Sequence, residues 1–102
     1  MDRSNVIELI PTVWREDENG IQKSTEGQPR QVMCQVRSVT RSEFFEGGRN
    51  GLNPELVFVM FSGDYNDETL LAYNGRRYAI YRTYIGRNDR IELYAERKGG
   101  TN

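Results

Sequence analysis

Histidine is absent from this chain of 102 residues, and cysteine occurs once. The lack of histidine excludes catalytic sites of the Ser-His-Asp and Cys-His types and every zinc site that needs imidazole. A single thiol cannot build an all-thiolate zinc site either. Cys34 has no partner for an internal disulfide, which favours a reducing compartment. The composition therefore predicts no catalytic centre of these kinds, no bound metal and no cofactor.

Long apolar runs are missing as well. No stretch approaches the roughly 20 apolar residues that a membrane-spanning helix needs. The first residues, Met1–Asn5, lack the charged and apolar layout of a signal peptide. We therefore expect a soluble protein that is made in the cytoplasm and has no membrane contact.

Charge is nearly balanced in total but unevenly distributed. The formal net charge is −1; residues 1–75 hold 7 basic and 12 acidic side chains, and residues 76–102 hold 7 basic and 3 acidic ones. Such a gradient favours head-to-tail contact between identical subunits, although a solvated surface without a role explains it equally well. The candidate interface residues are Arg76, Arg77, Arg82 and Arg87.

Short strand patterns separated by turns fill most of the chain. They predict strands over residues 5–15, 30–39, 56–61, 69–73, 76–84 and 90–97, with a ragged hairpin over 21–27. Pro11 predicts a bulge or an edge position, because proline cannot donate a ladder hydrogen bond. We expect one all-β domain over residues 1–102, a small antiparallel barrel or sandwich of about 6–7 strands, with a flexible tail at 99–102.

Individual positions in these strands can be assigned to a side. Asn74-Gly75 predicts a type I′ hairpin turn, since both residues tolerate positive φ angles. Alternation over 30–39 makes Cys34 a small buried residue rather than a reactive thiol. In the last strand, Ile91 and Leu93 are predicted to point inward and Tyr94 outward.

Residues 40–55 form an unusually long connection between two strands. Thr40 and Glu43 have the spacing of a capping box, so a short helix is predicted here, ending at Gly47-Gly48. Phe44 and Phe45 are adjacent and cannot both point at the core. Either one of them packs over a neighbouring strand, or one is left for a partner. An ordinary surface loop is the alternative.

Two clusters offer weaker functional interpretations. Arginine and tyrosine alternate over 76–94, with Tyr78, Arg82 and Tyr84 predicted on one strand face, and Arg77 and Tyr81 on the other. Stacking platforms for single-stranded nucleic acid have such composition, but cross-strand packing explains it more simply.

The second cluster lies in a turn and consists of Asp64, Asp67 and Glu68. Its carboxylates could ligate a hard cation. A turn rich in Asp and Asn needs no metal to explain it, and we favour that interpretation.

Several stretches resemble the phage head–tail joining proteins, also called head-closure or stopper proteins. They are residues 38–45, 48–55, 81–84 and 91–94, within a resemblance that extends over about residues 2–98. It implies a small β-barrel without enzymatic activity that assembles into a homo-oligomeric ring in the virion neck. The ring closes the DNA exit channel, and its implied partners are a portal or adaptor protein, a tail or tail-completion protein and the genomic double-stranded DNA.

In this family a long loop between two early strands projects toward the channel. Transferred to this chain, the resemblance implies a gating loop over residues 40–54. Its candidate residues are Thr40, Phe44, Phe45, Gly47, Gly48, Arg49, Asn50, Gly51 and Leu52. The alternative function is an OB-like barrel that binds single-stranded nucleic acid. The phage resemblance further implies that the protein is made and assembled in the cytoplasm of the bacterial host.

Overall fold

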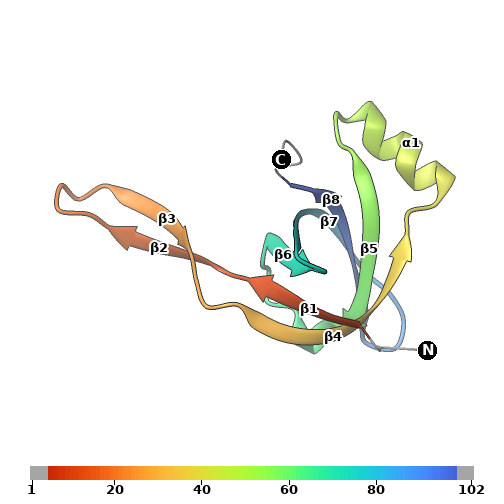
Figure 1. Ribbon diagram of the computed structural model, residues 1–102, viewed down its shortest axis with the longest axis horizontal. Coiled ribbons are helices and arrows are strands. Elements are labelled where there is room, and N and C mark those ends of the chain that lie inside the picture. Colours follow the sequence, from red (N-terminus) through yellow and green to blue (C-terminus); the bar gives the residue numbers. More distant parts are fainter. Residues whose placement is uncertain (1–4, 99–102) are drawn as a thin grey trace.

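Six antiparallel strands close into a barrel, and two further strands form an arm that projects from it (Figure 1). The computed structural model describes residues 5–98. Around the barrel the strand order is β1-β4-β5-β8-β7-β6. The elements are β1 (Asn5–Ile10), β2 (Thr12–Glu16), β3 (Gln22–Glu26), β4 (Arg30–Ser38), α1 (Arg41–Arg49), β5 (Pro54–Phe61), the 3-10 turn η1 (Ser62–Asp64), β6 (Leu70–Tyr73), β7 (Arg76–Ile85) and β8 (Arg90–Arg97).

The prediction of a small all-β barrel with a short helix is confirmed. The strand number is higher than predicted, because the segment around Pro11 is divided into β1 and β2 rather than forming one strand. The predicted flexible tail lies outside the described residues. Within residues 5–98, no helix has the length and apolar content that a membrane crossing requires.

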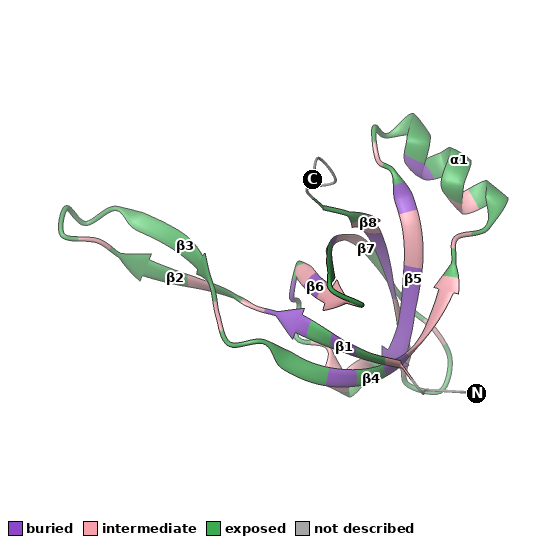
Figure 2. Cartoon of the chain, viewed as in Figure 1, coloured by how far each residue is buried: buried purple, intermediate pink, exposed green. Residues whose placement is uncertain are grey.

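The core fills the interior of the barrel and receives side chains from all six of its strands. Phe58 of β5 lies at its centre, fully buried, and its ring meets Tyr73 and Tyr78 edge-to-face at centroid distances of 5.5 and 5.7 Å. Cys34 is fully buried in this core, as predicted. Figure 2 shows how burial concentrates in the barrel and leaves the arm and most of α1 exposed.

One of the local predictions for β7 holds in the structure and another does not. Asn74 and Gly75 have φ angles of 52° and 74°, so the turn joining β6 to β7 has the positive angles that a type I′ hairpin needs. Farther along β7, however, the register against β8 shifts between Ile80 and Arg82. This bulge inserts one extra residue, so the predicted alternation over 76–84 fails beyond it.

The bulge brings Tyr81 and Arg82 to the same outer face of the barrel. Tyr81 packs against a small second cluster that contains Tyr94, and the Arg82 guanidinium lies 5.1 Å from the centre of the Tyr94 ring. Tyr94 itself is buried. Tyr94 thus points outward from the barrel, as predicted, but it is not exposed to solvent, because α1 and its flanking residues cover this outer face.

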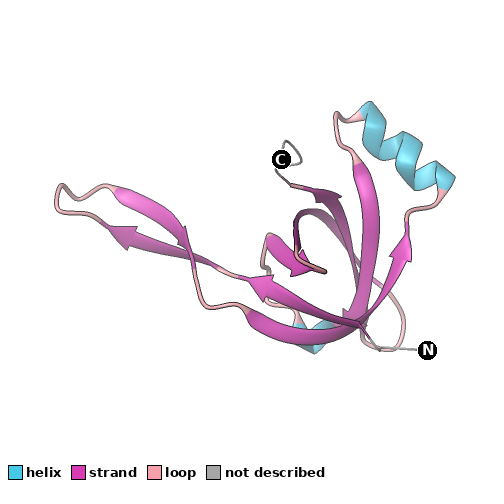
Figure 3. Ribbon diagram, in the orientation of Figure 1, coloured by secondary structure: helices cyan, strands magenta, loops and turns pink. Residues whose placement is uncertain are grey.

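The arm, residues 11–29, is a two-stranded sheet in which β2 pairs only with β3 among the described strands (Figure 3). Pro11 separates β1 from β2, and Gln28-Pro29 separates β3 from β4. The long axis of the molecule is 47 Å, against 30 and 25 Å for the other two. Because two strands have no interior, nearly all arm side chains are exposed.

Helix α1 begins as predicted and ends later than predicted. The Thr40 hydroxyl accepts from the Glu43 amide, and the Glu43 carboxylate accepts from the Thr40 amide, which completes the capping box. The helix continues through Gly47 and Gly48 to Arg49, with Asn50 as the C-cap. The two glycines were predicted to end the helix, but Gly47 is instead a buried contact point where α1 packs on β5.

We expect Gly47→Ala to destabilise the protein, although alanine favours helices. A Cβ at Gly47 would collide with the Pro54 side chain, and overpacking of this kind typically costs about 1–3 kcal/mol. The matched control is Gly48→Ala, where a Cβ would meet nothing within 4 Å; there we expect a gain of about 0.5–1 kcal/mol. Urea denaturation of both variants measures the contrast, and equal effects would contradict the packing of α1 on β5.

Candidate functional site

The outer face of the barrel beneath α1 carries a charged network. Arg37 of β4 donates to both carboxylate oxygens of Glu43 at 3.1 Å. The single proton of the Tyr94 hydroxyl is within hydrogen-bond distance of two carboxylates, Glu92 at 2.7 Å and Glu43 at 3.0 Å. These contacts tie α1 to β4 and β8. The helix is therefore held at both ends, by this network near its start and by Gly47 near its end.

The network changes the protonation behaviour of its members. The Arg37 guanidinium, assisted by the Thr40 amide and the Tyr94 hydroxyl, lowers the pKa of Glu43 to about 2, although burial opposes the shift. Burial, together with hydrogen bonds to Glu92 and Glu43, raises the pKa of Tyr94. At neutral pH, therefore, Glu43 is ionised and Tyr94 keeps its proton and donates it in a hydrogen bond.

The lowered pKa of Glu43 predicts a loss of stability in acid. Its pKa falls from an ordinary 4.5 to about 2 on folding, so its contribution is complete above pH 4.5 and disappears as the pH falls toward 2. We expect Glu43→Gln to be about 1–3 kcal/mol less stable than the natural protein at pH 7, with the difference shrinking steadily below pH 4.5. Urea titrations between pH 7 and 2 measure it, with exposed Glu46→Gln as the control.

A shallow pocket of about 380 Å³ opens beside this network. Its lining residues are Glu43, Glu46, Gly47, Asn50, Leu52, Tyr81, Arg82 and Tyr94. The Arg82 guanidinium lies over the Tyr94 ring, and the Glu43 carboxylate is held by Arg37. Two of the three charged side chains on its wall, Glu43 and Arg82, are thus engaged in structural contacts. The pocket lies between α1 and the outer face of β7 and β8.

The predicted gating loop forms mostly helix rather than an irregular loop. Thr40 is the N-cap; Gly47, Gly48 and Arg49 lie within α1; Asn50 is the C-cap; Gly51, at a φ of 76°, and Leu52 lead back toward β5. The Leu52 amide donates to the Gly47 carbonyl at 3.0 Å. Whether this segment gates a channel stays a prediction. What the structure describes is a helix held firmly on the barrel.

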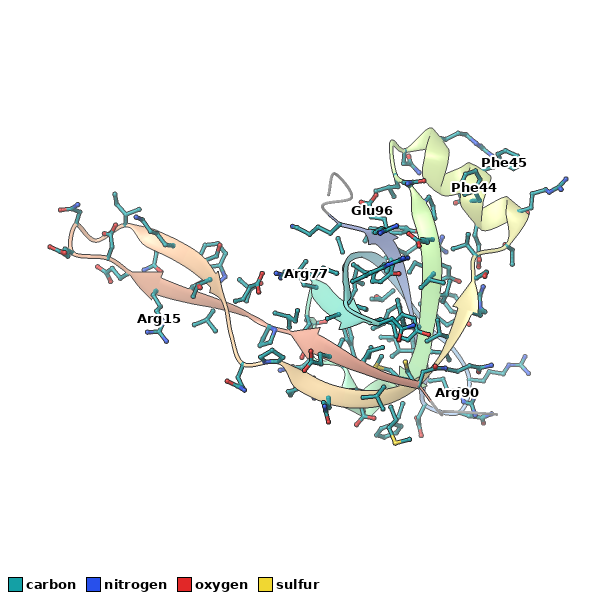
Figure 4. The ribbon with its side chains drawn as sticks, viewed as in Figure 1. Arg15, Phe44, Phe45, Arg77, Arg90 and Glu96 are labelled. Carbon is teal, nitrogen blue, oxygen red and sulfur yellow. The ribbon has the colours of Figure 1, made fainter. Side chains whose placement is uncertain are left out.

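Phe44 and Phe45 are both exposed on α1, with 46% and 58% of their surface accessible. Their rings contact each other edge-to-face at a centroid distance of 5.9 Å. Figure 4 shows both rings on α1, directed away from the barrel. Neither of them enters the core, so both are available to a partner. We call this pair the helix face.

The four candidate interface arginines do not form one patch. Arg77 pairs with Glu26 at the base of the arm, and Arg82 lies over Tyr94 beside α1. Arg76 begins β7, and Arg87 lies in the turn between β7 and β8. These four arginines therefore do not form a single basic surface.

Of the three carboxylates predicted as a possible cation site near η1, Glu68 has structural partners. Glu68 is buried and accepts hydrogen bonds from the Arg30 guanidinium at 2.6 Å and from the Asn66 amide at 2.8 Å. Among residues 5–98, no group of three or more Cys, Asp or Glu side chains is placed to hold a metal ion. Cys34 is buried, and burial raises the pKa of its thiol to about 11, so it is a poor nucleophile at neutral pH.

Sequence reasoning missed two further exposed apolar surfaces. On the arm, Trp14 and Ile21 are 66% and 55% exposed. At the end of β7, all residues from Arg82 to Ile85 are exposed, including Tyr84 and Ile85. We call this segment the β7 tip. For the arm, the sequence did contain a signal: the sole tryptophan lies next to the acidic turn Glu16–Glu18, in a segment that is too short to form a core around its side chain.

Comparison of the chain with protein-family models and with curated proteins finds no match. The function is therefore inferred from the sequence resemblance and from the arrangement of exposed side chains on the barrel.

Proposed function

We propose that the chain is a structural subunit of a phage or prophage virion, located in the connector between head and tail. In this proposal its copies form a ring that closes the DNA exit channel and provides a docking surface for the tail. The observation that carries the proposal is the distribution of exposed apolar side chains. Six of the nine large apolar side chains that are exposed among the described residues lie on the arm, the helix face and the β7 tip, three separate parts of the molecule; the other three are Val6 of β1, Met33 of β4 and Phe61 of β5.

A subunit of a neck ring has neighbours on several sides. It contacts two copies of itself, a portal or adaptor on the head side and a tail component on the other. Exposed apolar patches on a soluble protein mark interaction surfaces, and three of them suit such a position. The near-neutral net charge also fits a DNA conduit, since strong attraction for phosphates would slow the exit of the genome.

In this proposal the protein acts through contacts with other proteins rather than through turnover of a substrate. The barrel supplies a rigid frame, and α1 and the arm present side chains outside it. The ring, its portal, adaptor and tail partners, the DNA passing through it, and its location in the virion neck are all parts of this proposal. So is assembly in the cytoplasm of the host.

The test is genetic. We expect deletion of the gene from an inducible prophage to yield filled heads without tails, or heads that have lost their DNA, in electron micrographs of the lysate. A plasmid copy of the gene should restore infectious particles. Full, tailed and infectious virions from the deletion strain would refute the proposal.

The helix face should matter for assembly and not for folding. We expect the double variant Phe44→Ser, Phe45→Ser to change the free energy of unfolding by less than about 1 kcal/mol, because both rings are exposed. In the complementation assay the same variant should lower the titre of infectious particles at least tenfold. The control is Val6→Ser, at a half-exposed position on β1. A normal titre with the double variant would remove the helix face from the assembly surface.

The alternative, an OB-like barrel that binds single-stranded nucleic acid, is less well supported. Tyr78, one of its stacking candidates, is 2% exposed in the barrel core, so a base cannot stack on it. Arg82 is stacked on Tyr94. This alternative predicts oligonucleotide binding that weakens steeply with salt. A fluorescence anisotropy titration with labelled oligonucleotides measures such binding directly.

A further inference from the structure

We infer that the arm of one copy docks on the β7 tip of the next copy, adding a strand beside the end of β7 that extends beyond its pairing with β6. The inference rests on the proposed function in one respect, the choice of a second copy of this chain as the occupant. It goes further by naming the two surfaces that meet in the ring.

The arm has the properties of an element that is completed by a partner. An isolated two-stranded hairpin is marginally stable in water, and this one pairs with no other described strand. Both outer edges of such a ribbon present unpaired backbone groups to a neighbour. Trp14 and Ile21 add exposed apolar surface, of the aromatic kind that anchors protein interfaces.

The β7 tip provides the matching acceptor. Strand β6 pairs with β7 only from Arg76 to Ala79, whereas β8 pairs with β7 as far as Ile85. From Arg82 to Ile85, β7 therefore has a described partner strand on one side only. Tyr84 and Ile85 are 54% and 72% exposed on this segment. A strand from outside can continue the sheet here by β-augmentation.

Charge favours the second copy as the occupant. Residues 11–29 of the arm hold Arg15 and Lys23 against four acidic side chains, a net charge of −2. The β7 tip and the turn that follows it, residues 82–90, hold Arg82, Arg87 and Arg90 against Asp89, a net charge of +2. Complementary charges on two surfaces of the same chain steer one copy onto the next.

The position of the two surfaces makes the contact head-to-tail. In Figure 4, Arg15 lies on the arm at one end of the molecule, and Arg90 lies at the opposite end, where β8 begins. The β7–β8 turn lies at that same end (Figure 1). An arm cannot reach the β7 tip of its own chain from there. Two different surfaces that join in this way generate a ring when the rotation closes.

The first experiment uses chemical cross-linking of concentrated, purified protein. One chain carries Ser24→Cys on β3, opposite Trp14, and a second, tagged chain carries Thr83→Cys on the β7 tip. We expect a short bismaleimide to join the mixture into dimers. The natural Cys34 does not interfere, because it is fully buried. The matched control replaces Thr83→Cys by Ser38→Cys, an exposed position at the end of β4, and should give at least tenfold less product.

The second experiment follows the sole tryptophan of the chain, Trp14. Its emission should shift to the blue, and its quenching by iodide should fall, as the protein concentration increases and the arm becomes covered. We expect Ile85→Asp to abolish both changes while leaving the monomer folded, because Ile85 is 72% exposed. The control is Phe45→Asp, which should retain the shift of Trp14.

The outcomes separate the inference from the proposed function. Cross-links specific to Ser24 and Thr83, in a protein that is absent from phage particles, would support the inference and refute the proposed function. A protein present in particle necks, but without these cross-links both in concentrated solution and in the particles, would overturn the inference alone. Cross-links of Ser24 to Ser24, equal products with Ser38, or loss of the Trp14 shift in both aspartate variants would also overturn it.

Discussion

Replacing Phe58 by alanine is expected to lower the free energy of unfolding by about 3–5 kcal/mol. Phe58 is fully buried in the barrel and touches two tyrosine rings edge-to-face. Removing a buried phenylalanine leaves a cavity and typically costs 3–5 kcal/mol. A domain of this size has a total stability of about 5–15 kcal/mol, so the loss is a large fraction of the whole.

The matched control for Phe58 is Phe61, which belongs to the same strand but is 43% exposed. We expect Phe61→Ala to cost less than about 1 kcal/mol. Urea denaturation followed by far-ultraviolet circular dichroism measures both values. If the two variants lost the same stability, the assignment of the barrel interior as the single main core would be wrong.

Replacing Arg30 by alanine is the second substitution with a large expected effect. The Glu68 side chain is 2% exposed, and the Arg30 guanidinium lies 2.6 Å from its carboxylate. Removing one partner of a fully buried ion pair commonly costs about 3–5 kcal/mol. Because the Arg30 side chain is 44% exposed and the Asn66 amide still donates to Glu68, we expect a smaller loss of about 1–3 kcal/mol. The exposed pair of Lys23 and Asp17 supplies the control, since Lys23→Ala should cost less than about 1 kcal/mol.

The pH dependence of Arg30→Ala distinguishes a lost ion pair from simple loss of packing. In the natural protein, burial raises the pKa of Glu68, but the bonds from Arg30 and the Asn66 amide outweigh it and the pKa lies below its usual value. Without Arg30, burial acts with less opposition, and the pKa of Glu68 rises. A group whose pKa is higher in the folded state stabilises at low pH and loses that contribution as the pH increases.

The destabilisation caused by Arg30→Ala should therefore be greatest near pH 7 and should shrink as the pH falls through the range where Glu68 binds its proton. Denaturant titrations of the variant and of the natural protein at several pH values measure the difference. A destabilisation that stays constant between pH 7 and 4 would show that packing of the Arg30 stem, and not its charge, is what matters.

Phe58→Ala and Arg30→Ala both destabilise the barrel, whereas the proposed function depends on the surfaces that the molecule exposes. The arm, the helix face and the β7 tip are almost entirely exposed, so changes there should leave the barrel intact. This separation lets assembly defects be measured without interference from unfolding. It holds for the helix face because α1 is fixed to β5 through Gly47 and to β8 through Glu43.

The sequence by itself determined those features that depend on local patterns. Alternation placed Cys34 in the core, and Asn74-Gly75 specified a turn because few other residue pairs accept two positive φ angles. The capping box of Thr40 and Glu43 formed as expected, since it needs only a spacing of three residues. Several short strands that must bury one face each predicted a small all-β barrel or sandwich, and the structure has the barrel.

Only the tertiary structure decided the features that depend on distant parts of the chain. Tyr94 is buried because α1 covers its face of the barrel, which no pattern within β8 reveals. Gly47 lies within the helix rather than at its end. Glycine is needed at this position because the Pro54 side chain leaves no room for a Cβ. The bulge after Ile80 and the exposure of Trp14 on the arm result from strand register and strand pairing. These features depend on contacts between residues that are far apart in the sequence, and such contacts form only when the barrel closes. Local sequence patterns therefore do not predict them.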